Sequence, residues 1–300
     1  MHHRIGILGT GNVFGRYVTG LARRPEVLAA AEAGGRVPGS APDTFLGSAS
    51  RTARKALDDG LIGEPIGVSA FIRHSKAETW HPDPRFLFQH GGGPVLDMGP
   101  YYLAILVNLL GPVRSVAGAA RVGAPVRAVT APDRVVDRID VEVATHASAV
   151  LVFDSGVIGT TLMSFDVWDS ELPAIEVHGT EGTLTLPNPN HFDGDVRVRR
   201  HGDADWSVLP PVVGAVGTVG TVGAVGTVGT VGTVGTVGTK EQTCRGLGVR
   251  DLADAIEGGP HRANATFAFH VLEALSAIDG PGQVVRLEST CERPAPRFAQ

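Results

Sequence analysis

The spacing of hydrophobic positions divides the chain into regions of different structure. Close to the N-terminus, a short apolar run from Arg4 to Leu8 enters a glycine turn, and residues 13–24 can continue as a helix. Residues 27–33 favour a second short helix, whereas residues 34–42 are rich in glycine and proline, which favour turns. The pattern therefore predicts a strand, a turn and a helix, followed by a segment without a strand.

The middle of the chain combines helical spacing with a short apolar strand. Residues Ser48 to Leu61 place apolar side chains on one face of a helix, which leads into a strand from Ile66 to Ile72. A second helix, Leu96 to Leu110, is apolar on most of its faces, so we expect it to be buried. Gly111 and Pro112 should end this helix.

Farther along, the period of the hydrophobic pattern changes to two, which is typical of strands and hairpins. The expected strands are 139–143, 150–153, 157–165, 175–178, 183–186 and a further one around residues 196–198. Helices return at Val249–Ile256 and Thr266–Ala277. The pattern therefore predicts a strand, turn and helix at the N-terminus, and hairpins followed by helices in the second half of the chain.

Residues 213–239 repeat Val-Gly-Thr or Val-Gly-Ala, with glycine at every third position from Gly214 to Gly238. This period fits neither a strand nor a helix, and the tract lacks the proline that a collagen helix needs. We interpret it as a flexible surface loop that arose by expansion of a triplet. The alternative, a functional stacked repeat, would need longer units that bury a core.

Composition and charge exclude several classes of protein. A formal charge of −5 and a pI near 6.1 argue against a nucleic-acid partner. The one basic cluster, Arg197, Arg199 and Arg200, is interpreted as a solvated strand edge. No apolar run is long enough to span a bilayer. Cys244 and Cys291 match no zinc or redox spacing, which favours a cytoplasmic location.

The glycine turn near the N-terminus is a candidate phosphate-binding site. After a strand and before a helix, the backbone of Gly9, Thr10, Gly11, Asn12 and Val13 can approach a pyrophosphate. The alternative is an ordinary tight turn, because Phe14 stands where the third glycine usually lies. The acidic residue that would bind the adenosine ribose about 20 residues later is missing. The first 65 residues are also too short for several βαβ units, so a cofactor domain would be incomplete.

A second candidate site follows the Gly91-Gly92-Gly93-Pro94 turn. It places Asp97 and Tyr101 four residues apart on one face of a helix start, where an acid and a phenol could relay a proton. The alternative is that Asp97 stabilises the helix N-terminus and that the tyrosines pack in the core.

A polar and aromatic loop after the strand 66–72 is the third candidate. Its residues could bind a polyol or acid substrate, because binding residues are often found on such loops. They are His74, Lys76, Trp80, His81 and Arg85. The alternative is a solvated loop. The histidines show no metal-ligand spacing, so no metal is expected. His270 is expected to be a core histidine with hydrogen-bond partners.

Four stretches resemble the Gfo/Idh/MocA family of oxidoreductases. "RIGILGTGNV" is similar to the opening of that family, and "TARKALDDGLIGEPIGVSAFI" to its connecting helix and first C-terminal strand. "HPDPRFLFQHGGGPVLDMGPYYL" resembles the region with the motif GGG-x-x-x-D-x-G-x-H, and "IEVHGTEGTLTLPNP" resembles a later hairpin.

The resemblance implies an α/β Rossmann domain that binds NAD or NADP, and an α+β domain with a large, mainly antiparallel open sheet that shapes the substrate site and often mediates oligomerisation. It also implies a sugar or cyclitol substrate. Asp97 matches the acid of the motif, and Tyr101 stands where many relatives have a catalytic histidine. The family's Glu-Lys-Pro motif, which carries its catalytic lysine, does not occur in this sequence.

Two hypotheses follow. In both, residues 1–46 are a truncated NAD(P)-binding Rossmann remnant and residues 47–300 the α+β domain, with the loop 213–239 inside it. In the first, the protein is an oligomeric NAD(P)-dependent oxidoreductase in which Asp97 and Tyr101 move the proton. In the second, it is a catalytically defective homologue that serves as an oligomeric module. The missing ribose-binding acid and strand-end loops predict weak NAD(P) binding and little turnover.

Overall fold

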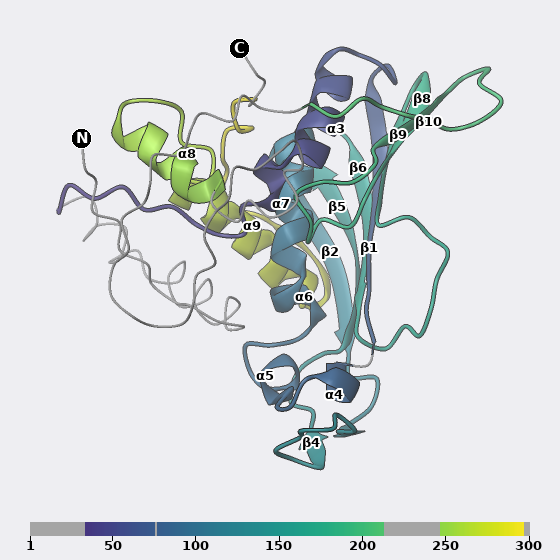
Figure 1. Ribbon diagram of the computed structural model, residues 1–300, viewed down its shortest axis with the longest axis vertical. Coiled ribbons are helices and arrows are strands. Elements are labelled where there is room, and N and C mark those ends of the chain that lie inside the picture. The colour runs from purple at the N-terminus through teal and green to yellow at the C-terminus, as the bar shows by residue number, and fades with distance from the viewer. Residues whose placement is uncertain (1–33, 76, 213–246, 297–300) are drawn as a thin grey trace.

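The computed structural model describes residues 34–75, 77–212 and 247–296 (Figure 1). The predicted N-terminal strand and helices, the glycine turn Gly9–Val13, Lys76 and the repeat 213–239 lie outside these described residues. The described part is built around one large sheet that carries helices on one of its faces.

The large sheet has nine strands in the order β10-β9-β8-β7-β1-β6-β5-β2-β11. Its neighbouring strands are antiparallel except for the pair β1 and β6. The predicted large, mainly antiparallel sheet is confirmed. The strands are β1 (Pro65–Arg73), β2 (Val113–Arg121), β5 (His146–Phe153), β6 (Ile158–Ser164), β7 (Ile175–Gly179), β8 (Gly182–Leu186), β9 (Arg197–Arg200), β10 (Ser207–Val208) and β11 (Pro281–Arg286).

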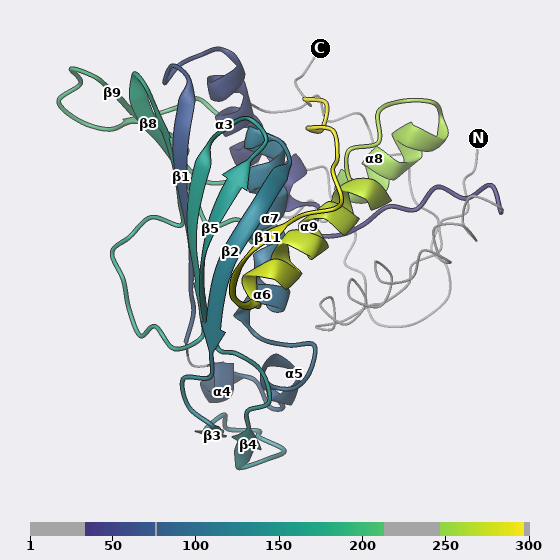
Figure 2. The same cartoon turned by 180° about the vertical axis from the view of Figure 1, so that it is seen from behind.

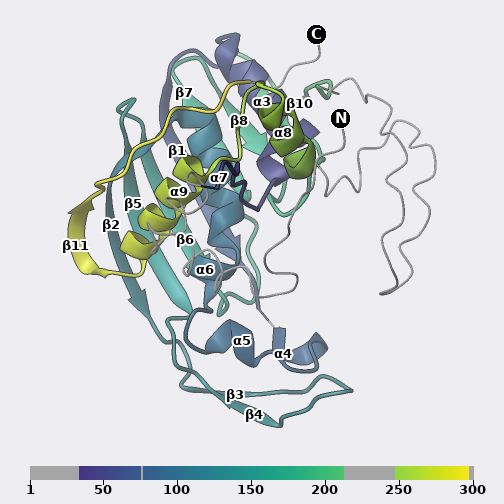
Figure 3. The same ribbon diagram turned by 90° about the vertical axis from the view of Figure 1, so that its left-hand side faces the viewer.

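Helices cover one face of this sheet (Figures 2 and 3). The central helix, α7 (Gly99–Leu110), is buried along almost its whole length, as the apolar pattern predicts. It packs against α9 (Ala265–Ile278), which also lies on β2, and against α3 (Ser48–Asp58). The short helices η1 (Thr44–Leu46) and α8 (Leu247–Ile256) lie beside this layer. None of the helices in the described part is long and apolar enough to cross a membrane.

A small lobe extends from one end of the large sheet (Figure 3). It contains α4 (Ala77–Trp80), α5 (Arg85–Phe88) and a two-stranded sheet of β3 (Val126–Ala128) and β4 (Arg138–Asp140). Its apolar side chains form a second core, with Leu87, Phe88 and Ile139 among them. The strand predicted at residues 139–143 is confirmed only in part, because β4 ends at Asp140 and belongs to the small lobe and not to the large sheet.

The elements that the sequence analysis missed have weak strand signals. β2 contains three alanines and a glycine in nine residues, and β11 begins with Pro-Gly. Such residues are depleted in strands, and their strand structure depends on pairing and packing. The predicted helix Leu96–Leu110 is also interrupted, since α6 (Pro94–Asp97) ends at Asp97 and α7 begins after Met98.

His270 on α9 is fully buried between β2 and the C-terminal segment. Its Nε2 accepts the Val113 backbone N–H at 2.9 Å, and its Nδ1 lies 3.0 Å from the Ser289 hydroxyl. A neutral imidazole that accepts at Nε2 carries its proton on Nδ1. The prediction of a core histidine with hydrogen-bond partners is confirmed.

We expect His270 to make the protein less stable in acid. Burial lowers the pKa of His270, so between its folded pKa and about pH 6.5 the unfolded chain binds a proton that the folded chain does not. The contribution of His270 to stability is thus complete above about pH 6.5 and decreases as the pH falls toward the folded pKa. Thermal unfolding between pH 7.5 and 5 should show a shallower acid loss in His270→Gln than in the wild type. The control is His178→Gln, at a half-buried histidine. The assignment is contradicted if His270→Gln loses melting temperature with falling pH as steeply as the wild type does, or if His178→Gln reduces this loss as much as His270→Gln does.

Candidate functional site

The glycine turn before α6 is shaped by close backbone contacts. A Cβ on Gly92 would lie 2.4 Å from the Phe86 carbonyl oxygen, and one on Gly93 would lie 2.9 Å from the Ala144 carbonyl oxygen. Gly93 also has a φ of +87°, a conformation that other residues rarely adopt. The turn therefore joins the small lobe to α6 in one defined geometry.

Asp97 is the last residue of α6 and is largely enclosed by the protein. Its N–H donates to the Gly93 carbonyl at 3.0 Å. Burial raises the pKa of the Asp97 carboxyl to about 6. A carboxyl group with this pKa can both accept and donate a proton near neutral pH, which is the property of a general acid or base.

Tyr101 lies in the first turn of α7, with its N–H donating to the Met98 carbonyl at 3.1 Å. Because the helix is interrupted at Met98, Asp97 and Tyr101 occupy the end of one helix and the start of the next, not one helix as the sequence predicts. The neighbouring Tyr102 is buried in the core, and burial raises its pKa to about 12, against an opposing effect of the Arg73 charge. Of the two phenols, the half-buried Tyr101 is therefore the better candidate for exchange with a substrate.

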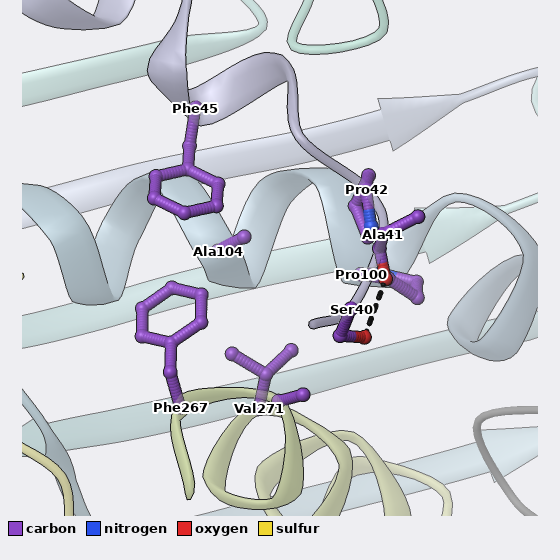
Figure 4. Close-up of a pocket in the computed structure, with 9 residues that line it drawn as sticks. Ser40, Ala41, Pro42, Phe45, Pro100, Ala104, Phe267 and Val271 are labelled. Atoms are coloured by element: carbon purple, nitrogen blue, oxygen red, sulfur yellow. Dashed lines mark hydrogen bonds between the residues drawn. The ribbon is translucent and has the colours of Figure 1, made fainter. Parts of the chain in front are cut away.

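A shallow apolar recess, partly open to solvent, lies beside the start of α7 (Figure 4). Phe45 of η1 and Phe267 of α9 stack at 5.0 Å between ring centroids and face Ala104 of α7. Pro100, in the same helical turn as Tyr101, forms another wall. Sequence analysis missed this recess because its walls come from three elements that are distant along the chain.

The predicted substrate loop runs along the small lobe. His74 is exposed and packs edge-on against Phe165. Trp80 is 58% exposed and has its ring 5.4 Å from the ring of His81. The Nδ1 of His81 accepts the Asp83 N–H at 3.0 Å. These three side chains therefore present imidazole and indole groups at the lobe surface.

Arg85 forms an ion pair within the same loop. Its Nε lies 2.7 Å from Asp83 Oδ1, and this contact lowers the pKa of the Asp83 carboxyl. The pair is exposed, so we expect it to contribute little to stability. Arg85 is thus partly neutralised by Asp83, which makes it a weaker ligand for an anionic substrate than the sequence alone implies.

The predicted site residues in the described part fall into two groups. Asp97 and Tyr101 stand at the junction of α6 and α7, on the main core, whereas the four described residues of the substrate loop belong to the small lobe. Residues 85–93 connect the two groups directly. No group of three or more potential metal-ligating side chains occurs within the described ranges.

This architecture defines an α+β domain. Helices cover one face of its nine-stranded open sheet, and an acid lies at the turn before its central helix. Residues 50–185 match the sequence model described as the GFO/IDH/MocA C-terminal domain. Over these residues, just under half of the chain, the sequence is similar to the C-terminal domain of the Gfo/Idh/MocA family.

Solved structures of oxidoreductases share the fold. An NAD binding oxidoreductase from Klebsiella pneumoniae has a TM-score of 0.61 and 22% identity, over 87% of this chain and 69% of that one. Levoglucosan dehydrogenase in complex with NADH and levoglucosan has a TM-score of 0.60 and 18% identity, over 82% and 65%. An oxidoreductase from Thermotoga maritima has a TM-score of 0.53 and 16% identity, over 81% and 60%.

This chain spans about two thirds of the length of these solved structures. At such low identity the similarity concerns the fold. None of the curated protein sequences matches the chain.

Proposed function

We propose that the protein is an NAD(P)-dependent oxidoreductase that transfers a hydride to or from a carbinol carbon of a sugar or cyclitol. Asp97 carries this proposal. Its burial places the carboxyl pKa at about 6, in the range where one group can take up and release the proton of a substrate hydroxyl. The match of residues 50–185 to the GFO/IDH/MocA C-terminal domain supports the reaction class, and the named substrate of levoglucosan dehydrogenase supports a carbohydrate.

The roles of the acid and the phenol follow from their positions. Above pH 6, the Asp97 carboxylate accepts the proton that a carbinol loses on oxidation, and the Tyr101 hydroxyl orients that carbinol. In the reverse direction, the Asp97 carboxyl returns the proton. Tyr101 could take part in the proton transfer only together with Asp97, because an ordinary phenol has a pKa near 10.

The recess beside α7 is a candidate contact surface for the nicotinamide end of the cofactor, because its walls are apolar and it opens to solvent next to Tyr101. Pro100, Ala104 and Phe267 would contact the ring, and Gly9–Val13, outside the described residues, would hold the phosphates. When bound, the nicotinamide accepts or donates the hydride.

The substrate would lie between Asp97 and the small lobe. His74, Trp80 and His81 offer hydrogen-bonding and stacking groups for a polyhydroxy ring, and Lys76 and Arg85 complete the predicted loop. The Asp83–Arg85 ion pair reduces the free positive charge of the loop, so the described residues suit a neutral polyol better than an acid.

A second candidate function is that of an oligomeric module without catalysis. The absence of a Glu-Lys-Pro sequence, and with it of the family's lysine, favours this candidate. Both candidate functions assume a domain boundary at residue 46 and a shortened cofactor domain before it.

Calorimetric titration with NADH and NADPH separates the two candidates, when it is combined with a dehydrogenase assay on a panel of sugars and cyclitols. The oxidoreductase proposal expects binding, weak because the ribose-binding acid is missing, together with turnover of a neutral polyol. Absence of both binding heat and turnover would refute it and leave the module.

We also expect the protein to form at least a dimer in the cytoplasm through the open face of its sheet. Val150, Ile158 and Val284 are exposed there, on the side opposite the helices, and Ile158 is 56% exposed. Exposed apolar side chains on a sheet face without covering helices are typical of an interface.

Light scattering at micromolar concentration measures the association. Ile158→Glu should lower the mass to that of a monomer, because the new carboxylate would have to be desolvated in the interface. Val135→Glu is the matched control, since Val135 is equally exposed but lies near the small lobe. A monomeric wild type contradicts the prediction.

A further inference from the structure

Arg127 links the small lobe to the large sheet. It lies on β3, and its guanidinium reaches two carboxylates from different parts of the chain. Nη1 lies 3.1 Å from Oε1 of Glu78, on α4, and Nη2 donates to Oδ1 of Asp166, which follows β6. The three side chains are only 10%, 17% and 23% exposed, so solvent screens this ion-pair network much less than a surface pair.

Further contacts fix each partner of Arg127. The second oxygen of Asp166 accepts the Thr145 hydroxyl at 2.6 Å, and Thr145 Oγ1 accepts the Gly123 N–H at 2.9 Å. The Arg127 guanidinium also lies over the Phe88 ring, 5.0 Å from its centroid. Arg127 therefore contacts α4 through Glu78, α5 through Phe88 and the end of β6 through Asp166.

Backbone hydrogen bonds hold the substrate loop against the same lobe. The N–H groups of Thr130 and Ala131 donate to the Glu78 carbonyl, that of Val135 donates to the Pro82 carbonyl, and that of Glu142 to the Phe88 carbonyl. All four donors lie between residues 130 and 142. Consequently the lobe and the segment 78–88 form one unit, and any displacement of the lobe moves Trp80 and His81 with it.

Four chain segments connect this unit to the main body, between β1 and α4, α5 and α6, β2 and β3, and β4 and β5. The chain passes from Phe88 through the Gly92–Gly93 turn into α6, which packs on the main core. The glycine turn defines only this connection, whereas the contact between Arg127 and Asp166 joins the lobe to a residue two positions after the end of β6 in the large sheet. The side-chain network thus links the substrate loop directly to the end of β6, a strand against which α6 also packs.

We propose that Arg127 is a positioning residue of the substrate site: by bridging Glu78 and Asp166 it holds Trp80 and His81 in place relative to β6, against which the helix that carries Asp97 packs. The part of this inference that concerns substrate rests on the proposed function. Without the guanidinium, two carboxylates would face each other in a poorly solvated space, and their repulsion would displace α4 from β6. A lysine keeps the charge but cannot bridge both carboxylates or stack on Phe88 in the same way.

The first test requires no activity. The chain has three tryptophans, and Trp168→Phe together with Trp206→Phe leaves Trp80 as the only indole. In that background we expect Arg127→Met to increase the amplitude of the nanosecond component of Trp80 anisotropy decay, and Arg127→Lys to give a smaller increase. The matched control is Arg138→Met, on the same hairpin, where Arg138 forms an exposed ion pair with Asp140. Unchanged Trp80 mobility in Arg127→Met, with circular dichroism like that of the wild type, would overturn the inference.

The second test uses the best substrate of the sugar panel. Misplaced binding groups should raise KM by about 10- to 100-fold in Arg127→Met while kcat changes less, since Asp97 stays on the main core. Arg127→Lys should recover part of the affinity. A merely structural role would lower the amount of active enzyme, seen as a lower kcat at constant KM, and this result would reject the positioning role. If the wild type has no turnover, the proposed function fails. The Trp80 measurement alone then tests whether Arg127 holds the loop in place.

Discussion

Replacing Asp97 with asparagine is expected to lower kcat by about 100- to 10,000-fold, the usual contribution of a general acid or base. Asparagine keeps the size of the side chain but neither accepts nor releases a proton near neutral pH. Steady-state kinetics on the best polyol measures the effect. The exposed Asp59→Asn on the C-terminal side of α3, where Asp59 pairs with Lys55, is the control and should keep wild-type rates.

The same substitution should increase stability, which separates catalysis from folding. Raising the pKa of the buried Asp97 carboxyl to about 6 costs up to about 3 kcal/mol at pH values well above 6, because the folded protein must hold a desolvated carboxylate. Asp97→Asn removes this cost, so its melting temperature should exceed that of the wild type at pH 8, and the difference should fall to about half at pH 5, because the unfolded carboxyl still ionises above about pH 3.8. The rate of oxidation by the wild type should rise with pH through about 6. Wild-type turnover in Asp97→Asn would remove Asp97 from the mechanism.

Replacing Gly118 with valine is expected to destabilise the protein by about 3 kcal/mol, at the upper end of the cost of overpacking. Gly118 lies on β2, directly beneath the C-terminal end of α9. A Cβ at this position would lie 2.4 Å from the carbonyl oxygen and 2.7 Å from the Cα of Ile278. Backbone atoms cannot move aside as a flexible side chain can, so the helix would have to separate from the sheet.

Urea denaturation measures this effect through the midpoint of unfolding. Ala119→Val is the matched control, because Ala119 is the next residue of β2 and points to the open, exposed face. Its midpoint should stay close to that of the wild type. Equal midpoints for both variants would mean that α9 is not packed on β2 as described.

The sequence determined the elements whose signals are local. The hairpin of β5 and β6 has period-two spacing and a turn in which Gly156 takes a φ of +89°. The hairpin of β7 and β8 has the same period-two spacing. The buried helix α7 follows from its continuous apolar composition. Asp97 could be identified from the sequence because it follows a glycine turn. Its raised pKa could not be predicted, because it depends on burial in the folded protein.

Only the tertiary structure decided the contacts between distant segments. The parallel pairing of β1 with β6 joins residues about ninety positions apart, and no turn signal specifies it. β2 is a strand because β5 and β11 pair with it, despite its alanines and glycine. Arg127 looks in sequence like any surface arginine, and becomes the partner of Glu78 and Asp166 once the small lobe folds onto the end of the sheet. The physical reason is that hydrophobic period and turn chemistry act over a few residues, whereas burial and charge pairing depend on which distant segments the core brings together.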